Sequence, residues 1–256
     1  MNTCVHLAVY PDTLWLCPSG EIDSSNVLLL EEAFWMARNY ANAETYLDCK
    51  ELTFISSAGL GQIIHAINSL KAVGSTLVIG RLNETVKLAL GALGLHRFVK
   101  MEDRPRPQEL DLEAVGIIVN SDLRELKSVR TFLETSFTRI RYDDVAAYGL
   151  KMAVDELVSN VIRHNYNGTT GKPVSVMLSR QDDTLEASVI DQGFAFDPTR
   201  YEGRAFDKTI AGGYSGGMGI NLVRALADSF AYETRDGHNL TQVRKSFDRT
   251  SRQKLL

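Results

Sequence analysis

One segment near the middle of this 256-residue chain limits what the chain can fold into. Residues 102–108 (EDRPRPQ) are mostly charged, carry two prolines and show no apolar period. Proline lacks a backbone N–H and restricts the residue before it, so helices and inner strands rarely continue through such a segment. The stretches on either side are each long enough to form a domain core. We therefore expect two domains, at residues 1–101 and 113–248, joined by a linker at 102–112 and followed by a tail at 249–256.

The first half alternates short apolar runs with amphipathic segments. The runs predict strands over residues 5–16 (with a turn at Pro11 and Asp12), 14–22, 45–49 and 75–80. Apolar residues three or four positions apart predict helices over residues 28–37, 58–71 and 84–93. Strands that alternate with helices of this length favour a small α/β domain.

The second half has a different order, with two long helices near its start. Strands are expected over residues 114–119, 174–179, 185–191, 229–235 and 242–247. Helices are expected over residues 123–137 and 143–164 and from 219 onward. Residues 198–216 are rich in glycine and polar residues, a composition that predicts a mobile loop.

The long helix expected over residues 143–164 carries Glu156, Asn160 and His164 at intervals of four residues. Residues at this spacing share one helix face. A carboxylate can accept a proton from an attacking hydroxyl, and an asparagine amide oxygen suits a hard cation such as Mg²⁺. Polar residues on a helix ordinarily form a solvated face, so the spacing alone leaves both interpretations open.

Two glycine clusters follow the long helix. Asp191 ends an apolar strand and Gly193 follows it, so a carboxylate lies where the backbone can approach a ligand ring closely. Gly216, Gly217 and Gly219 lie where an amphipathic helix begins, and glycine amides at a helix N-terminus suit phosphate groups. Glycine also serves turns and helix starts for steric reasons alone. The helix carboxamide and the two clusters, in this order, together predict a nucleotide pocket.

Two serines precede the helix expected over residues 58–71. Ser56 and Ser57 follow an apolar pair and lie where the helix begins. A serine at this place is ordinarily an N-cap. The same place presents a hydroxyl beside unpaired backbone amides, and the helix dipole would favour a phosphate group there.

Residues 113–248 resemble the ATP-binding domain shared by gyrase, Hsp90, histidine kinases and MutL. Within that group they are most similar to the anti-sigma factor serine/threonine kinases. The resemblance rests on an N box at 153–164 (AVDELVSNVIRH), a first glycine box at 191–193 (DQG) and a second at 217–219 (GMG). It implies a two-layer α/β sandwich that binds ATP and Mg²⁺.

The same resemblance assigns roles to single residues. It makes Glu156 the general base, Asn160 the Mg²⁺ ligand and Asp191 the reader of adenine. Residues 198–216 become the ATP lid. The nucleotide-binding glycines are Gly193, Gly216, Gly217 and Gly219. Ala195 departs from the pattern, because many relatives carry a second glycine there, and we expect altered nucleotide affinity from it.

Residues 1–101 resemble a STAS domain, the fold of anti-anti-sigma factors. The resemblance rests on the segment 55–60 (ISSAGL) and on the order of strands and helices, which implies a small mixed sheet with helices. The family's phosphoacceptor serine corresponds to Ser57. Ser56 stands where characterised phosphoacceptor domains often carry aspartate. Two interpretations are therefore open, a phosphorylated Ser57 or a domain that serves only for docking.

Together the two resemblances imply a bacterial partner-switching regulator. We expect an ATP-dependent serine protein kinase and anti-sigma factor that acts on STAS domains, including Ser57 in cis or in trans. The expected partners are a STAS-domain protein, a sigma factor or both, and the expected assembly is a homodimer. Arg130 corresponds to a position that relatives use for partner contacts, although an ordinary exposed helix arginine is an equal interpretation. The alternative function is a non-catalytic, ATP-responsive docking module, motivated by Ala195 and Ser56.

Composition excludes several other classes of protein. A net charge of −4 and a pI near 5.8 indicate neither a nucleic-acid-binding surface nor a polybasic membrane patch. No apolar stretch approaches the roughly 18 to 20 residues that span a bilayer, and the N-terminus has no secretory signal. Three scattered cysteines indicate reduced thiols. We therefore expect a cytoplasmic protein.

Overall fold

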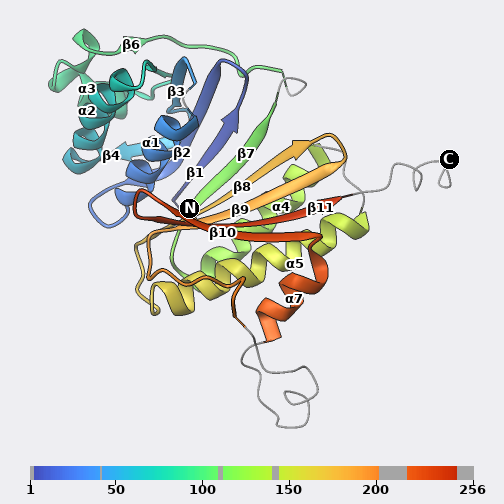
Figure 1. Cartoon of the computed structure of the whole chain (residues 1–256). Helices are drawn as coiled ribbons and strands as arrows, with labels where there is room; N and C mark the ends of the chain where they lie inside the picture. The colour runs from blue at the N-terminus through green and yellow to red at the C-terminus, as the bar shows by residue number, and fades with distance from the viewer. Residues whose placement is uncertain (1–2, 41, 109–111, 140–143, 202–217, 247–256) are drawn as a thin grey trace. The chain divides into compact units, whose positions relative to one another are not determined.

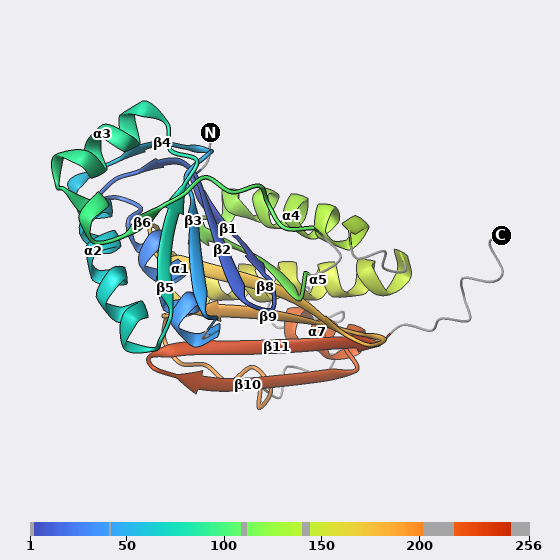
Figure 2. The same ribbon diagram turned by 90° about the horizontal axis from the view of Figure 1, so that it is seen from above.

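The computed structural model describes residues 3–40, 42–108, 112–139, 144–201 and 218–246. The chain divides into two compact units (Figures 1 and 2). The first unit comprises residues 1–120 and 171–173, and the second comprises residues 121–170 and 174–256. Each unit combines helices with a sheet, so the expected two-part α/β organisation is confirmed.

The first unit is built on a mixed sheet with the strand order β7-β1-β2-β3-β5-β6. These strands are β1 (Cys4–Val9), β2 (Thr13–Ile22), β3 (Glu44–Asp48), β5 (Thr76–Gly80), β6 (Lys100–Met101) and β7 (Ala114–Asn120). β1 runs antiparallel to β2 and β7, whereas β2, β3, β5 and β6 run parallel. A short strand that the sequence did not predict, β4 (Leu52–Ile55), pairs with the end of β2.

Among the described residues of the first unit, three segments form α-helices: α1 (Leu28–Tyr40), α2 (Ser57–Ala72) and α3 (Glu84–Ala92). A 3₁₀ turn, η1 (Leu95–Arg97), follows α3. α1 packs against β1, β2 and β7, and α2 packs against α1, β4 and β5. The three helices were all predicted from apolar spacing, because each buries one stripe of its surface against the sheet or a neighbouring helix.

Strand alternation gives the first sheet two buried faces. Four aliphatic residues at most 2% exposed lie opposite one another on adjacent strands of one face: Leu7, Leu16, Leu47 and Ile79. The other face carries a row with two aromatic residues: Ala8, Trp15, Tyr46 and Val78. The rings of Trp15 and Tyr46 lie 4.1 Å apart between centroids. Both faces therefore need a cover.

Residues 102–106 cover part of the aromatic row, and we call this segment the strap. Tyr46 Oη donates a hydrogen bond to the carbonyl of Glu102 at 2.9 Å and accepts one from the backbone N–H of Arg104 at 3.2 Å. The Arg104 guanidinium lies 5.8 Å from the Tyr46 ring centroid and pairs with Glu44 and Glu102. The segment that the sequence marks as a linker is thus fastened to the sheet of the first unit.

The strand expected at the start of the second domain also joins the first unit. β7 pairs antiparallel with β1, from Ala114 opposite Val9 to Ile118 opposite Val5. The compact units accordingly divide at Asn120. The domain boundaries that we expect from sequence composition stay a prediction. The pairing of β7 with β1 shows which strands share a sheet, but it does not test where a domain begins or ends.

The second unit has two layers. Its sheet has the antiparallel order β10-β11-β9-β8, formed by β8 (Pro173–Gln181), β9 (Thr184–Asp191), β10 (Ser229–Arg235) and β11 (His238–Ser246). Its helices are η3 (Leu123–Glu125), α4 (Leu126–Arg139), α5 (Asp144–Asn160), the π-helix η4 (Val161–Asn165) and α7 (Met218–Leu226). α5 packs against β9 and β11 and is flanked by α4 and α7. In the parts of the chain that the structure describes, no helix is long and apolar enough to cross a membrane.

Candidate active site

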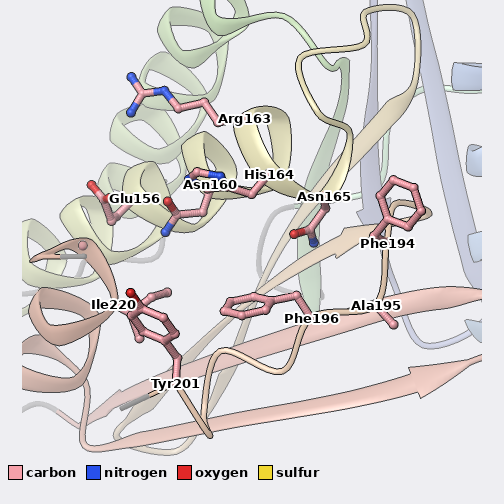
Figure 3. A pocket seen from close by; sticks show the side chains of 11 residues that line it. Glu156, Asn160, Arg163, His164, Asn165, Phe194, Ala195, Phe196, Tyr201 and Ile220 are labelled. Carbon is pink, nitrogen blue, oxygen red and sulfur yellow. The ribbon is translucent and has the colours of Figure 1, made fainter. Parts of the chain in front are cut away.

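A cavity of about 660 Å³ opens in the second unit between the end of α5, the turn after β9 and the start of α7 (Figure 3). Eleven of the described residues line it: Glu156, Asn160, Arg163, His164, Asn165, Phe194, Ala195, Phe196, Tyr201, Gly219 and Ile220. A volume of this size is ordinary for a site that holds a small organic ligand. The lining combines aromatic rings with a few polar groups, as such sites usually do.

The face of α5 predicted from the four-residue spacing lies on this cavity. Glu156 and Asn160 project side by side from the last turn of the helix, and His164 follows on η4 (Figure 3). Glu156 and Asn160 are half-buried, so neither belongs to a fully solvated face. The arrangement brings a carboxylate and a carboxamide to the mouth of one cavity, where a proton acceptor and an oxygen ligand for a cation can act together.

The start of α7 approaches Glu156 closely because residue 219 is glycine. A Cβ atom at Gly219 would overlap Oε1 and the carboxyl carbon of Glu156. The absent side chain therefore allows the first turn of the helix to pack against the carboxylate. Gly219 lines the cavity, whereas Gly216 and Gly217 of the same glycine cluster lie outside the described residues.

Asp191 ends β9 as predicted, but it is 1% exposed. Its Oδ1 accepts hydrogen bonds from the Gly193 amide at 2.8 Å and from Asn239 Nδ2 at 2.9 Å. Its Oδ2 accepts one from Asn165 Nδ2 at 3.1 Å. Among the described residues that line the cavity, Asn165 is present and Asp191 is not. The carboxylate is therefore held behind an amide side chain.

Gly193 also lies at the contact between Asp191 and Asn165. A Cβ atom on Gly193 would lie 2.6 Å from the carbonyl oxygen of Asn165, closer than real Cβ atoms come. The next amide, that of Phe194, donates a hydrogen bond to this carbonyl at 2.9 Å. Glycine at this position thus lets the turn after β9 dock directly on the end of η4.

The π-helix η4 directs Asn165 toward this turn. The amide of Tyr166 donates to the carbonyl of Val161 at 3.0 Å, a five-residue step that widens the helix at its last turn. Tyr166 Oη accepts a hydrogen bond from the Gln192 amide at 2.8 Å. η4 is consequently fastened to the turn after β9 at several points, and its last residue, Asn165, faces Asp191.

Sequence reasoning missed several cavity residues, above all the aromatic ones. Phe194 is 76% exposed, and the rings of Phe196 and Tyr201 meet edge to face at 5.9 Å between centroids. Exposed rings beside a cavity offer surfaces on which a flat ligand can stack. The signal was the pattern Phe-x-Phe directly after the Asp-x-Gly box. Arg163 lies within the N box and Asn165 directly follows it, but neither residue carried a spacing signal of its own.

The predicted phosphoacceptor lies in the first unit. Ser56 is the N-cap of α2, because its Oγ accepts the Gly59 amide at 3.4 Å. Ser57 is the first helical residue and is exposed, and no hydrogen bond of its hydroxyl is found among the described residues. The sequence left open whether a serine here caps the helix or presents a free hydroxyl. Ser56 caps the helix, and Ser57 presents its hydroxyl to solvent.

Arg130 has a structural partner. Its Nε and Nη2 donate hydrogen bonds to the two oxygens of Asp155 at 2.6 and 2.8 Å, which links α4 to α5 one residue before Glu156. The Asp155 carboxylate raises the pKa of the Arg130 guanidinium. The ion pair explains the position of Arg130. Its side chain is still half exposed, so a contact between Arg130 and a partner protein stays a prediction.

Residues 5–106 match the family model of the STAS domain, and residues 119–245 match that of the histidine kinase-like ATPase domain. The serine/threonine-protein kinase BtrW of Bordetella bronchiseptica is 28% identical over 110 residues, which are 42% of this chain and 76% of that protein. The serine-protein kinase RsbW of Bacillus velezensis is 33% identical over 100 residues, 38% of this chain and 61% of that protein. Among solved structures, an anti-sigma factor antagonist from Mycobacterium paratuberculosis is 19% identical with a TM-score of 0.35, covering 40% of this chain and 86% of that one.

Proposed function

The chain combines a STAS domain with a histidine kinase-like ATPase domain, and from that premise we propose that it is a bacterial partner-switching regulator. Its second half acts as an ATP-dependent serine protein kinase on STAS domains. The ATPase domain implies ATP use. BtrW, named a serine/threonine-protein kinase, and RsbW, named a serine-protein kinase, are similar to part of the chain and support the proposal.

One observation carries the catalytic part of the proposal. Glu156 and Asn160 lie one helical turn apart on the same cavity, and Gly219 allows the start of α7 to pack against Glu156. This arrangement gathers a proton acceptor, a cation ligand and the beginning of a helix within one site. Phosphoryl transfer depends mainly on positioning and on electrostatic stabilisation, which these three groups can supply.

Each group has a distinct task. Glu156 accepts the proton of the attacking serine hydroxyl, which lets the oxygen approach as a better nucleophile. Asn160 would hold Mg²⁺ through its amide oxygen, and ATP supplies the phosphoryl group that is transferred. The aromatic residues Phe194, Phe196 and Tyr201 limit the access of water and offer surfaces to a base.

Ser57 is the proposed acceptor on this chain. Its hydroxyl is exposed at the first position of α2, and a phosphate group there would lie beside the unpaired amides of the helix start. A separate STAS-domain protein and a sigma factor are the further proposed partners, and a homodimer is the proposed assembly. We place the protein in the cytoplasm, in keeping with three cysteines of which none forms a disulfide in the described residues.

Incubation with Mg-ATP followed by phosphosite mapping tests the proposal. The wild-type chain, or a STAS-domain protein supplied with it, should acquire phosphoserine. Glu156→Gln should lower the rate at least about 100-fold, because a positioned general base contributes that much or more. Glu233→Gln, an exposed substitution on β10, is the matched control and should keep the rate.

The two serines of α2 form a second matched pair. Ser57→Ala should abolish the phosphoserine of this chain, whereas Ser56→Ala removes the cap and should keep the acceptor. Equal phosphate on Ser57→Ala would overturn the acceptor assignment. No phosphoserine on either protein would leave the non-catalytic docking module as the function.

A further inference from the structure

We propose that Arg163 binds the phosphoryl group that is transferred from ATP, beside the carboxylate of Glu156. The inference rests on the proposed function, because it concerns the phosphates of the nucleotide in that same cavity. It adds a cationic side chain to the proton acceptor and the cation ligand of the proposed function. Three observations support it: the charges around the cavity, the free donors of Arg163 and the direction of its side chain.

The charges around the cavity call for a cation. Among the described lining residues, Glu156 is the acidic one, and Arg163 is the one with a permanent positive charge. The triphosphate of ATP is polyanionic, and phosphoryl transfer spreads negative charge over the oxygens of the group that moves. A guanidinium near Glu156 would offset the repulsion between this charge and the carboxylate.

Arg163 differs from the other arginines of the second unit in its lack of a protein partner. The residue is exposed, and no ion pair or hydrogen bond of its side chain is found among the described residues. The other arginines of this unit whose side chains the structure describes all have partners. Carboxylates pair with Arg124, Arg130, Arg200, Arg235 and Arg244, and backbone carbonyls accept hydrogen bonds from Arg180 and Arg224. The described part of the chain therefore leaves the donors of Arg163 unused.

The side chain of Arg163 is directed toward Glu156. Arg163 follows Asn160 by three residues, so it lies about one helical turn further along the cavity that both line. Side chains on a helix lean toward its N-terminus and cover the preceding turn. Figure 3 shows the guanidinium extending to the side where Glu156 lies, whereas Asn165 lies toward the opposite end. Asp191, the expected reader of adenine, contacts Asn165 at that opposite end, so Arg163 is directed away from the base.

A guanidinium suits a phosphoryl group for a geometric reason. Its planar fork of N–H donors can donate two parallel hydrogen bonds to two oxygens of one phosphate. During transfer, the bond from the phosphorus to the β-phosphate oxygen breaks, a bond to the serine oxygen forms, and the serine proton passes to Glu156. The oxygens that Arg163 binds take no part in this exchange, so its hydrogen bonds can persist while the charge develops.

Binding of ADP and of the non-transferable ATP analogue AMP-PNP, each with Mg²⁺, tests the contact without turnover. Calorimetry on the full chain should show a dissociation constant for AMP-PNP about tenfold higher in Arg163→Gln, the effect of one hydrogen bond to a charged group. The constant for ADP should stay unchanged. Arg163→Lys keeps the charge but loses the fork, so it should lie between the wild type and Arg163→Gln.

Arg180→Gln is the matched control. It removes the same charge from an exposed arginine of β8 that is not among the lining residues, so both dissociation constants should stay unchanged. Equal weakening of AMP-PNP and ADP in Arg163→Gln would overturn the inference, because the contact would then be to a phosphate that remains on ADP.

The rate separates contact with the transferred group from contact with the acceptor protein. With ATP and a STAS-domain acceptor at saturation, kcat of Arg163→Gln should fall about 100-fold, a usual effect of losing one donor to a transition state. A raised KM for the acceptor with an unchanged kcat would overturn the inference, because Arg163 would then serve docking.

The remaining outcomes distinguish this inference from the proposed function. A wild-type chain that binds neither nucleotide would overturn the proposed function itself. If the wild type binds both, and Arg163→Gln keeps the wild-type ratio of the two constants and the wild-type unfolding midpoint, the role of Arg163 alone is overturned. Arg163→Lys supplies the same comparison if Arg163→Gln fails to fold.

Discussion

Single residues set how closely the parts of the candidate site approach one another. Gly193 and Gly219 lie at contacts where a Cβ atom would strike the end of η4 or the carboxylate of Glu156. In both places the requirement is for space, since neither residue has the left-handed backbone conformation that also favours glycine. Because these two glycines have no Cβ atom, the backbone can approach Asn165 and Glu156 more closely than any other residue would allow.

Substitution of Gly219 tests this interpretation. Gly219→Ala should leave the chain folded, because the overlapping atoms belong to the flexible end of Glu156, but it should displace that carboxylate. The expected result is a fall in the phosphorylation rate of about tenfold or more, since misplacement of a catalytic group by about 1 Å can cost up to 100-fold. The measurement is the initial rate together with the thermal unfolding midpoint.

Gly149→Ala is the control for that substitution. Gly149 also lies on a helix of the second unit, and a Cβ there would meet Leu226 at an ordinary 3.6 Å. It should keep the rate, and the gain in helix propensity should not destabilise the chain. An equal loss of rate in both variants would contradict the role assigned to Gly219.

Among the elements, two short segments have effects beyond their length. The π-helix η4 adds one residue to a helical turn and thereby aims Asn165 at Asp191. The strap at 102–106 covers Tyr46 and supplies Arg104 to two carboxylates. Gly80 makes the strap possible, because a Cβ there would overlap both Tyr46 Oη and the carbonyl of Glu102.

The strap should loosen in acid. Hydrogen bonds from Arg104, and next from Lys100, lower the pKa of Glu102 from 4.5 to about 2. A folded-state pKa below the unfolded one contributes stability that is complete above pH 4.5 and is lost as the pH falls toward 2. Because the side chain of Glu102 is 38% exposed, the effect should be local. Hydrogen exchange of residues 99–108, corrected for intrinsic rates, should show protection that declines across this window.

Arg104→Ala should reduce this protection already at neutral pH, because it removes the main cause of the lowered pKa of Glu102. Arg97→Ala, an exposed arginine on η1, is the matched control and should leave protection unchanged. Equal protection in wild type and Arg104→Ala at pH 7 would show that the ion pairs do not hold the strap.

At the scale of the whole molecule, the question is whether Ser57 meets the candidate site of its own chain or that of another chain. The strap ends at Arg106 and β7 begins at Ala114, and both are attached to the sheet of the first unit. Residues 107–113 connect these two attachments within the first unit, so their length does not limit how Ser57 could reach the candidate site.

We expect phosphorylation of Ser57 to occur between molecules. An encounter of two chains can bring the acceptor of one to the site of the other, whatever the arrangement of the two units within a chain. The rate per molecule should fall as the protein is diluted, and a chain with Glu156→Gln should still be phosphorylated by an added Ser57→Ala chain. A rate per molecule independent of concentration, with no rescue in the mixture, would contradict transfer in trans.

The sequence by itself determined the features that depend on residues close together along the chain. The spacing of Glu156 and Asn160 fixes that they share a helix face, and the apolar periods predicted α1, α2, α3 and α5 closely. The two family resemblances, carried by short motifs, are confirmed. The roles assigned to Glu156, Asn160, Asp191 and Ser57 stay predictions.

Only the tertiary structure decided which distant groups meet. Periodicity did not indicate that Asn165 would lie against Asp191, that residues 102–106 would cross Tyr46, or that β7 would pair with β1. Each contact joins residues that are 26 or more positions apart, so it depends on strand register, on one widened helical turn and on the space left by glycine. Such contacts are selected by packing of the whole chain, whereas helix faces follow from the geometry of a few consecutive residues.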